Sequence, residues 1–475
     1  MAYEGLMVSV SGVRGRVGEA LTPEVVATFA AGFGAWAAAS ASARRAAGGD
    51  GVPGPAGNGG RPTVVVGRDS RVSGPMFHRA AIAALQSVGC DVIDIGLTTT
   101  PTCQLSVEHH HAAGGLMISA SHNPIEWNAL KFIAPSGLFL DAAEGQAMRE
   151  AMERGPIPRA TWERLGAVRP DEGAIARHID LVLSLPFLDV EGIRKRRFKV
   201  ALDCVRGAGG AFMPLLLDRL GCQVTAIHLE TDGRFPHPPE PVAENLKDLE
   251  ALVRRSGAEI GFAVDPDVDR LALVSELGEA IGEDYTLALA ARVVLRHRNG
   301  PVVTNLSTSR VVEDVAAAAN SRVIRAPVGE VNVATRMRSE RAPVGGEGNG
   351  GVILSEMHLG RDAPVGAALM LQLLLEDGRP LSEIVRDYPR YVIVKDKLDR
   401  PSASLSTVYD ALRSAFPDAG ADTQDGLRLT WPDRWVHVRP SGTEPIVRVI
   451  AEAPTAEQAR ELVARCREPL DALSR

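Results

Sequence analysis

The chain has 475 residues, which at roughly 150 residues per domain predicts about three domains. Hydrophobic residues make up 45% and charged residues 23%, close to the averages of globular proteins, so disordered, collagen-like and coiled-coil classes are excluded. The net charge of −7 and the 4% of aromatic residues supply neither a basic field nor stacking platforms for bases. Nucleic acid is therefore not expected as a partner.

The cysteine pattern and the apolar stretches bear on the compartment. Five cysteines are scattered along the chain without a C-x-x-C pair, which disfavours a disulfide framework and predicts a reducing cytoplasm. The alanine-rich stretch 25–39 contains two glycines and falls short of the about 20 residues of a membrane span, so we expect a buried helix and no membrane. Residues 48–61, dense in Gly and Pro, are predicted to form a surface loop.

Short apolar strands alternate with helical stretches along most of the chain. We predict strands at 63–66, 91–95, 116–118, 199–203, 260–264, 271–274 and 302–305. Polar turns and helical stretches follow these strands, as is typical of α/β units. Segments 427–431, 435–438 and 446–451 instead alternate like half-exposed antiparallel strands, before a helix that Pro454 opens. The predicted domains are 1–170, 171–297, 298–387 and 388–475, the last of the α+β class.

The most specific motif is SASHNP at 119–124, directly after the strand 116–118. It places the hydroxyl of Ser121 beside the imidazole of His122 in a turn, where Ser121 could accept and donate a transferable group. Asn128 and Lys131 add a polar and a cationic group downstream. A plain strand-end turn, with Asn-Pro as its ending, is the alternative reading.

The second motif is DPDVDR at 265–270, between two apolar strands. Asp265, Asp267 and Asp269 can converge on one hard divalent cation, which would offset their mutual repulsion. An EF-hand is excluded because Arg270 stands where the sharp turn needs glycine and because the flanks are strands. A solvated acidic turn is the remaining alternative.

A glycine-rich loop, GGEGNGG, occupies 345–351. It precedes a strand rather than opening a helix, so the Rossmann interpretation is poor. Its backbone can approach a small polar ligand, and Glu347 and Asn349 can form hydrogen bonds with hydroxyl groups. A flexible hairpin without a ligand is the alternative.

The fourth motif is RPSGTEP at 439–445, followed by Arg448 on the next strand. Two guanidiniums, two hydroxyls and the amides around a glycine make an anion nest, and phosphate is the ligand that we expect there. The residues of this nest are Arg439, Ser441, Gly442, Thr443 and Arg448. A structural turn is the alternative. The sequence contains no G-x-x-x-x-G-K-[ST], which excludes a P-loop nucleotide site.

These four motifs, in this order, resemble those of the α-D-phosphohexomutase family over nearly the whole chain. The resemblance implies an α/β protein of three related mixed-sheet domains plus a C-terminal α+β domain, arranged as a heart around a central cleft. It also implies roles for particular residues. Ser121 would be the phosphorylated serine and, with Asp265, Asp267 and Asp269, a ligand of Mg²⁺. The other reacting residues would be His122, Lys131, Arg14 and Arg270. The substrate-binding residues would be Glu347, Asn349, Glu330, Arg439, Ser441, Gly442, Thr443 and Arg448.

Some positions depart from the family pattern. Pro266 stands where glycine is usual, and Asn349 and Gly351 stand where many members have Ser and His. One family candidate for proton transfer is therefore absent, and Glu330 becomes a candidate acid or base beside Lys131.

The resemblance implies a cytoplasmic isomerase, monomeric or homodimeric, that interconverts hexose 6-phosphate and hexose 1-phosphate through a bisphosphorylated sugar. Glucosamine phosphate is the first candidate substrate, with mannose and glucose phosphates as alternatives. A metal-dependent sugar-phosphate phosphatase and a non-catalytic sugar-phosphate sensor are the competing functions.

Overall fold

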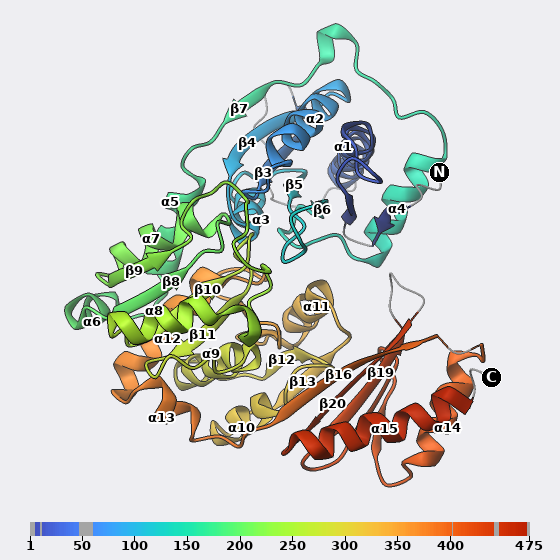
Figure 1. Ribbon diagram of the computed structural model, residues 1–475. Helices are drawn as coiled ribbons and strands as arrows, with labels where there is room; N and C mark the ends of the chain where they lie inside the picture. Colours follow the sequence, from blue (N-terminus) through green and yellow to red (C-terminus); the bar gives the residue numbers. More distant parts are fainter. Residues whose placement is uncertain (1–4, 10–11, 47–59, 401, 441–445, 473–475) are drawn as a thin grey trace. The chain divides into compact units, whose positions relative to one another are not determined.

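The computed structural model describes residues 5–9, 12–46, 60–400, 402–440 and 446–472 (Figure 1). The predicted loop at 48–61 therefore lies almost wholly outside the described residues. The chain forms two compact units. The first comprises Met1–Glu283 and Gly351–Leu381, and the second comprises Asp284–Gly350 and Ser382–Arg475.

The N-terminal part of the first unit is built on a seven-stranded mixed sheet with the order β1-β2-β6-β5-β3-β4-β7. Its strands are β1 (Met7–Val8), β2 (Gly12–Arg16), β3 (Thr63–Arg68), β4 (Asp91–Leu97), β5 (Gly114–Ile118), β6 (Trp127–Ile133) and β7 (Val168–Pro170). Its helices are α1 (Pro23–Ala46), α2 (Gly74–Ser87), α3 (Thr100–His109) and α4 (Ala142–Glu153). The predicted parallel strands β3, β4 and β5 are confirmed, whereas β6 runs antiparallel to β5 and β2.

The alanine-rich stretch forms α1, and its buried face confirms the predicted core helix. Phe33 stacks on Phe132 of the sheet, with 5.2 Å between the ring centroids. A Cβ atom added to Gly34 would lie only 2.9 Å from Leu85 of α2, so a glycine lets the two helices approach closely (Figure 1). By length and composition Pro23–Ser42 could cross a membrane, but 61% of the tested window is buried inside the protein.

The middle part of the first unit has a four-stranded sheet with the order β11-β10-β8-β9. Its strands are β8 (Lys199–Asp203), β9 (Gln223–Ile227), β10 (Ile260–Val264) and β11 (Leu271–Ser275). The helices are α5 (Ala174–Leu183), α6 (Val190–Arg196), α7 (Gly209–Arg219), α8 (Lys247–Ser256) and, from the returning segment, α12 (Ala363–Asp377) after β15 (Gly351–Leu354). Short 3₁₀ helices lie at η1 (Trp162–Arg164) and η2 (Ala243–Asn245). The β10–β11 pair is antiparallel, so the three predicted metal ligands occupy a hairpin turn.

The second unit contains two sheets. In one, β12 (Val302–Asn305) pairs in parallel with β13 (Val323–Ala326) and β14 (Val344–Glu347), accompanied by α10 (Val311–Ala318) and α11 (Glu330–Glu340). The other is antiparallel with the order β16-β20-β19-β18-β17. Its strands are β16 (Val392–Asp399), β17 (Gly420–Asp422), β18 (Leu427–Thr430), β19 (Trp435–Pro440) and β20 (Ile446–Ala453), with α14 (Leu405–Ala415) and α15 (Ala456–Ala472). Helices α9 (Glu283–His297) and α13 (Leu381–Val385) span two of the points where the chain passes between units. The predicted C-terminal α+β class is confirmed.

Candidate active site

Ser121 lies in the turn after β5, with its side chain buried and aimed at the aspartate hairpin. Its hydroxyl donates to Asp265 Oδ2 at 2.8 Å, and His122 Nδ1 lies 3.4 Å from Ser121 Oγ. The backbone of Ser121 has φ 50°, a left-handed conformation that costs a non-glycine residue about 1–2 kcal/mol. Its N–H donates to Ser119 Oγ at 2.9 Å, which helps to hold this turn. Such strain, maintained by surrounding contacts, is typical of functional sites.

The side chain of Arg71 fixes the conformation of the serine turn. Its guanidinium donates to four main-chain carbonyl oxygens at 2.6–2.9 Å, those of Ser121, Asn123, Pro124 and Trp127. It also pairs with Asp69 at 3.2 Å, and its side chain is fully buried. The conformation of the serine turn therefore depends on one arginine from the loop after β3. Arg71 was not among the predicted site residues, although the charged cluster GRDSR at 67–71 stands directly after an apolar strand.

The hairpin between β10 and β11 brings together Asp265, Asp267 and Asp269, as predicted. All three are buried, and one carboxylate oxygen of each lies within 4.8 Å of the others. Burial, and then the neighbouring Asp269 and Asp267, raise the pKa of Asp265 well above its usual value. The Oδ1 atoms of Asp267 and Asp269 are buried without a hydrogen-bond partner among the described residues. This arrangement of oxygen donors fits a divalent cation, which would relieve both the repulsion and the unpaired oxygens.

Two cations from other elements reach the same carboxylates. Lys131 Nζ, on β6, lies 2.6 Å from Asp267 Oδ2 and 3.7 Å from Asp269 Oδ2. Arg361, just before α12, lies 2.7 Å from Asp269 Oδ2. Burial lowers the pKa of Lys131, but Asp267 and Asp269 outweigh it and raise that pKa above its ordinary value. Lys131 is therefore a cation in this arrangement, able to donate a proton or stabilise negative charge.

The other predicted residues of the first unit contact the serine turn or the aspartate hairpin. Arg14, on β2, donates to Asn123 Oδ1 at 2.6 Å. Glu240 lies 3.6 Å from Arg270 and 3.8 Å from His122 Nε2, although its string PEP at 239–241 reads in the sequence as a plain loop. Burial, together with Arg270 and Arg14, lowers the pKa of His122 to about 2. His122 is therefore a neutral imidazole at neutral pH and can accept a proton or a hydrogen bond.

In the second unit, Glu347 at the end of β14 lies close to the start of α11, which carries the predicted sugar-binding residue Glu330. Glu347 Oε1 accepts hydrogen bonds from Asn305 Nδ2 at 2.8 Å and from Gly329 N at 3.1 Å. The second bond places Glu347 at the start of α11, where Glu330 is buried in the first turn. Asn349 is half-buried in the turn after β14. These residues can offer two carboxylates and an amide to hydroxyl groups.

The predicted anion nest is described in part. Arg439 lies opposite Arg448 in the β19–β20 register, and it pairs with Asp425 at 3.1 Å. Asp425 also accepts from Val328 N at 3.0 Å, so this carboxylate links the arginine strand to the turn before α11. Asp425 was missed because nothing in its local sequence marks it. The predicted ligands Ser441, Gly442 and Thr443 lie outside the described residues.

A buried histidine beside Asp425 predicts a pH dependence of stability. His437 Nε2 lies 2.6 Å from the Asp425 carbonyl oxygen and Nδ1 lies 2.8 Å from Ser307 Oγ, and burial lowers the pKa of His437 to about 4. As the pH falls, His437 therefore takes up a proton near pH 6.5 in the unfolded chain but only near pH 4 in the folded chain. We expect about 3 kcal/mol of stability to be lost as the pH falls from 6.5 to 4. Urea unfolding at several pH values should show that the free energy of unfolding depends less on pH in His437→Gln than in the wild type. The same pH dependence in both proteins would contradict the lowered pKa of His437.

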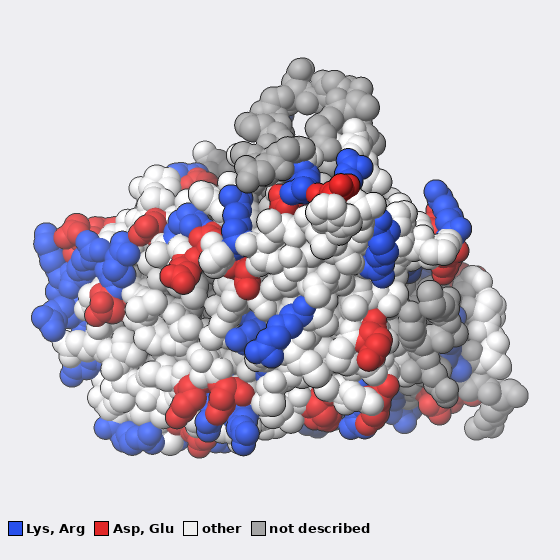
Figure 2. Space-filling model, turned by 90° about the horizontal axis from the view of Figure 1, so that it is seen from above, with Lys and Arg blue, Asp and Glu red and all other residues white. Residues whose placement is uncertain are grey.

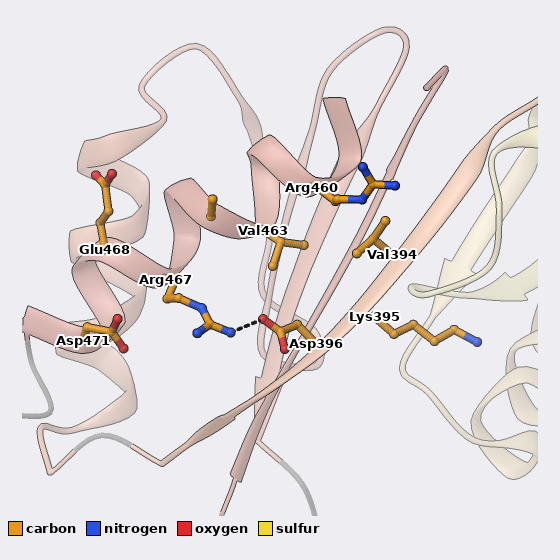
Figure 3. Close-up of a pocket in the computed structure, with 9 residues that line it drawn as sticks. Val394, Lys395, Asp396, Arg460, Val463, Arg467, Glu468 and Asp471 are labelled. Carbon is orange, nitrogen blue, oxygen red and sulfur yellow. Dashed lines mark hydrogen bonds and ion pairs between the residues drawn. The ribbon is translucent and has the colours of Figure 1, made fainter. Parts of the chain in front are cut away.

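A separate groove of about 440 Å³ lies in the C-terminal sheet domain, between β16 and α15 (Figure 3). Its lining mixes both charge signs, and Arg467 is ion-paired with Asp396 at 2.5 Å. None of the predicted site residues lines this groove. It is therefore not the candidate active site.

A phosphoryl-transfer enzyme needs the groups found here: a serine hydroxyl, nearby buried carboxylates and cationic side chains. Comparison with known families identifies which one. Four models of phosphoglucomutase/phosphomannomutase domains match: alpha/beta/alpha domain I at residues 6–156, domain II at 176–278, domain III at 282–391 and the C-terminal domain at 394–468. The chain belongs to the phosphoglucomutase/phosphomannomutase family.

Individual relatives cover nearly the whole chain. A probable phosphoglucosamine mutase of Methanopyrus kandleri is 38% identical over 96% of each chain, and a phosphoglucomutase/phosphomannomutase of Thermococcus kodakarensis is 37% identical over 96% of each. A crystal structure of a phosphoglucomutase/phosphomannomutase family protein from Burkholderia thailandensis matches with TM-score 0.81 and 26% identity over 98% of each chain. The protein is thus an isomerase of the phosphohexomutase class, as the motifs predicted.

Proposed function

We propose that this enzyme moves a phosphoryl group between the C6 and C1 oxygens of a hexose phosphate through a phosphoserine at Ser121, with glucosamine phosphate as first substrate. The observation that supports this most strongly is the 2.8 Å contact between Ser121 Oγ and Asp265 within a cluster of carboxylates and cations. The substrate choice rests on the relative from Methanopyrus kandleri, named a probable phosphoglucosamine mutase. Mannose and glucose phosphates are the alternatives, because the second relative is named for both.

The proposed reaction is a pair of phosphoryl transfers. The free hydroxyl of the sugar bonds to the phosphorus of phosphoserine while the bond from phosphorus to Ser121 Oγ breaks, which yields a bisphosphorylated sugar. The hydroxyl proton goes to a base, for which we propose Glu330, because Lys131 already carries its proton. The sugar then turns, and its other phosphoryl group bonds to the Ser121 Oγ that the first transfer left as an alkoxide, while the sugar oxygen that it leaves takes back the proton held by Glu330. No phosphate is consumed.

The residues of the first unit have electrostatic roles in this proposal. A phosphoryl group in transfer spreads negative charge over its equatorial oxygens, so positioning and charge stabilisation carry the catalysis. Lys131, Arg14 and Arg270 supply positive charge, and neutral His122 orients the group on Ser121. We propose that Asp265, Asp267 and Asp269, with the phosphoserine, hold Mg²⁺, which when bound supplies Lewis-acid stabilisation. Glu347, Asn349 and Arg439 bind the sugar and its non-reacting phosphate, with Ser441, Gly442, Thr443 and Arg448.

The metal assignment gives a direct prediction. Asp267→Asn should raise the Mg²⁺ concentration for half-maximal activity by at least about tenfold, because one anionic oxygen ligand is lost. The measurement is the mutase rate as a function of free Mg²⁺. Asp180→Asn, at an exposed ion pair with Arg219, is the matched control and should leave the curve unchanged. A wild-type curve for Asp267→Asn would remove Asp267 from the metal site.

The substrate proposal is tested by a parallel assay. Rates are measured with the phosphates of glucosamine, N-acetylglucosamine, glucose and mannose at one Mg²⁺ concentration. We expect the highest kcat/KM with glucosamine phosphate. A higher value with mannose or glucose phosphate would replace this substrate and leave the mutase reaction intact.

Partners and compartment are part of the same proposal. We propose a cytoplasmic monomer or homodimer whose ligand is the hexose phosphate, without nucleic acid or membrane. The surface charge supports the absence of nucleic acid from this proposal, because acidic and basic side chains are interspersed on the face seen in Figure 2. Mixed charges of this kind largely cancel beyond a Debye length of about 10 Å, so this face offers no extended field to a polyanion.

A further inference from the structure

A second cluster of metal-ligating side chains shares no residue with the three aspartates of the hairpin. Asp203 ends β8, His228 follows β9, and His237 lies in the loop beyond. The two strands are parallel neighbours, with Asp203 opposite Ile227, so their carboxyl ends meet at one edge of the sheet. Asp203 Oδ1 lies 3.0 Å from His228 Nδ1, and Asp203 Oδ2 lies 3.2 Å from His237 Nε2. The end of β8 and the segment after β9 thus bring one carboxylate and two imidazoles together.

Each histidine also has a polar neighbour at its outer ring nitrogen, a hydrogen bond for His237 and a longer ion-pair contact for His228. His237 Nδ1 lies 2.9 Å from the carbonyl oxygen of Pro238, which can only accept, so Nδ1 carries a proton. In the neutral ring, Nε2 then points a lone pair at the cluster. His228 Nε2 lies 4.0 Å from a carboxylate oxygen of Asp248, on the far side from Asp203. Metal-binding histidines characteristically have such a partner at the second nitrogen, because it fixes the tautomer and the ring orientation.

We propose that Asp203, His228 and His237 bind a borderline divalent transition-metal ion, of which Zn²⁺ is the type. Two imidazole nitrogens and a carboxylate oxygen are ligands that Zn²⁺ accepts at a three-residue site, with water as the fourth ligand. Asp203 is buried, while the histidine side chains are 22% and 16% exposed, so solvent reaches the cluster from the side of the histidines. The imidazoles hold the pKa of Asp203 down to about 2 in spite of its burial, so this ligand is ionised.

The cluster differs in chemistry from the three-aspartate hairpin. Mg²⁺ prefers oxygen ligands alone, whereas imidazole nitrogens favour Zn²⁺ and its neighbours in the transition series. One protein can therefore hold two different ions at the two sites. When no transition metal is bound, the same side chains form a hydrogen-bonded group, and an entering metal must displace any proton on the coordinating nitrogens.

The segment that carries both histidines runs on to the serine turn. Gly233 packs so closely on the Ser70 carbonyl that a Cβ atom would clash there, and the ring of Phe235 lies under Arg71, 5.0 Å from its guanidinium carbon. Glu240, farther along, lies beside His122 and Arg270. An ion that ties His228 and His237 to β8 would thus fix the segment that carries Glu240. It would stabilise the folded protein, because it binds the folded chain in preference to the unfolded one.

The test uses full-length protein stripped of metal with a chelator and then saturated with Mg²⁺. Zn²⁺ is titrated calorimetrically, and Co²⁺ is added as a spectroscopic probe of tetrahedral nitrogen and oxygen ligands. We expect one equivalent of Zn²⁺, visible Co²⁺ absorption and a higher unfolding temperature with Zn²⁺. His237→Gln and His228→Gln should each weaken Zn²⁺ binding at least about tenfold and remove the Co²⁺ absorption.

His110→Gln is the matched control. The sequence also has three consecutive histidines at 109–111, and His110 pairs with Asp171 at 2.7 Å. This variant should bind Zn²⁺ as the wild type does. Three results would overturn the proposal: wild-type protein that binds no equivalent of Zn²⁺ in the presence of Mg²⁺, full binding in both His237→Gln and His228→Gln, or loss of the equivalent in His110→Gln. A cooperative unfolding transition in the absence of Zn²⁺ verifies that each variant is folded.

Discussion

Ser121→Ala should lower the mutase kcat/KM by on the order of 10⁴-fold or more while the protein stays folded. The substitution removes the oxygen that accepts and returns the phosphoryl group, and loss of a nucleophile has effects of this size in well-studied enzymes. Folding should survive because the left-handed backbone of Ser121 is held by Arg71 and Ser119, whose contacts are with main-chain atoms. The measurements are the coupled mutase rate and the denaturant midpoint.

The control for this variant is Ser106→Ala. Ser106 is also buried, and its hydroxyl donates to the Thr102 carbonyl at 2.7 Å within α3, so the control loses a comparable hydrogen bond without losing a nucleophile. Mass spectrometry after incubation with hexose 1,6-bisphosphate should find one phosphoryl group on wild-type protein and on Ser106→Ala, and none on Ser121→Ala. A phosphorylated or fully active Ser121→Ala would refute the phosphoserine assignment.

Arg71→Lys should lower the free energy of unfolding by about 3–5 kcal/mol and reduce turnover as well. The ammonium group keeps the charge but cannot reproduce the planar set of donors that now satisfies four carbonyl oxygens and Asp69. Buried acceptors left without partners, and a weakened buried ion pair, have costs of this size. Turnover should fall because the serine turn loses its support.

Arg68→Lys provides the comparison at the same strand end. Arg68 donates one hydrogen bond, to the Asp69 carbonyl at 3.0 Å, and we expect its substitution to change the free energy of unfolding by less than about 1 kcal/mol. Urea unfolding of both variants separates the two cases. Equal, small changes would show that Arg71 does not support the turn.

Local patterns were sufficient to predict the parallel core of the α/β units. Strands such as Lys199–Asp203 and Val302–Asn305 coincide with the predicted ranges because continuous apolar runs end there in polar turns. Strands β2 and β16 were missed, because β2 is rich in Gly and Arg and β16 alternates charged residues on an exposed face. The antiparallel placement of β6 is a long-range pairing, which no local pattern contains.

In the candidate site too, residues in local motifs could be predicted from the sequence, whereas residues that act through long-range contacts could not. Ser121 and the three aspartates were predicted because each lies in a short, distinctive motif after a buried strand. Arg71, Arg361, Glu240 and Asp425 were not assigned, because their importance comes from partners far away in sequence: Arg361 and Asp269, for example, are 92 positions apart. The domain limits at 170, 297 and 387, and the heart-shaped arrangement around a cleft, stay predictions.

The most direct test of the proposed reaction is a ³¹P NMR time course. Phosphorylated enzyme is mixed with an excess of glucosamine 1-phosphate, Mg²⁺ and a trace of the bisphosphate. We predict that the 6-phosphate signal rises as the 1-phosphate signal falls, with their sum constant and with no growth of inorganic phosphate. Growth of inorganic phosphate in step with loss of the 1-phosphate, without 6-phosphate, would identify a phosphatase and contradict the account.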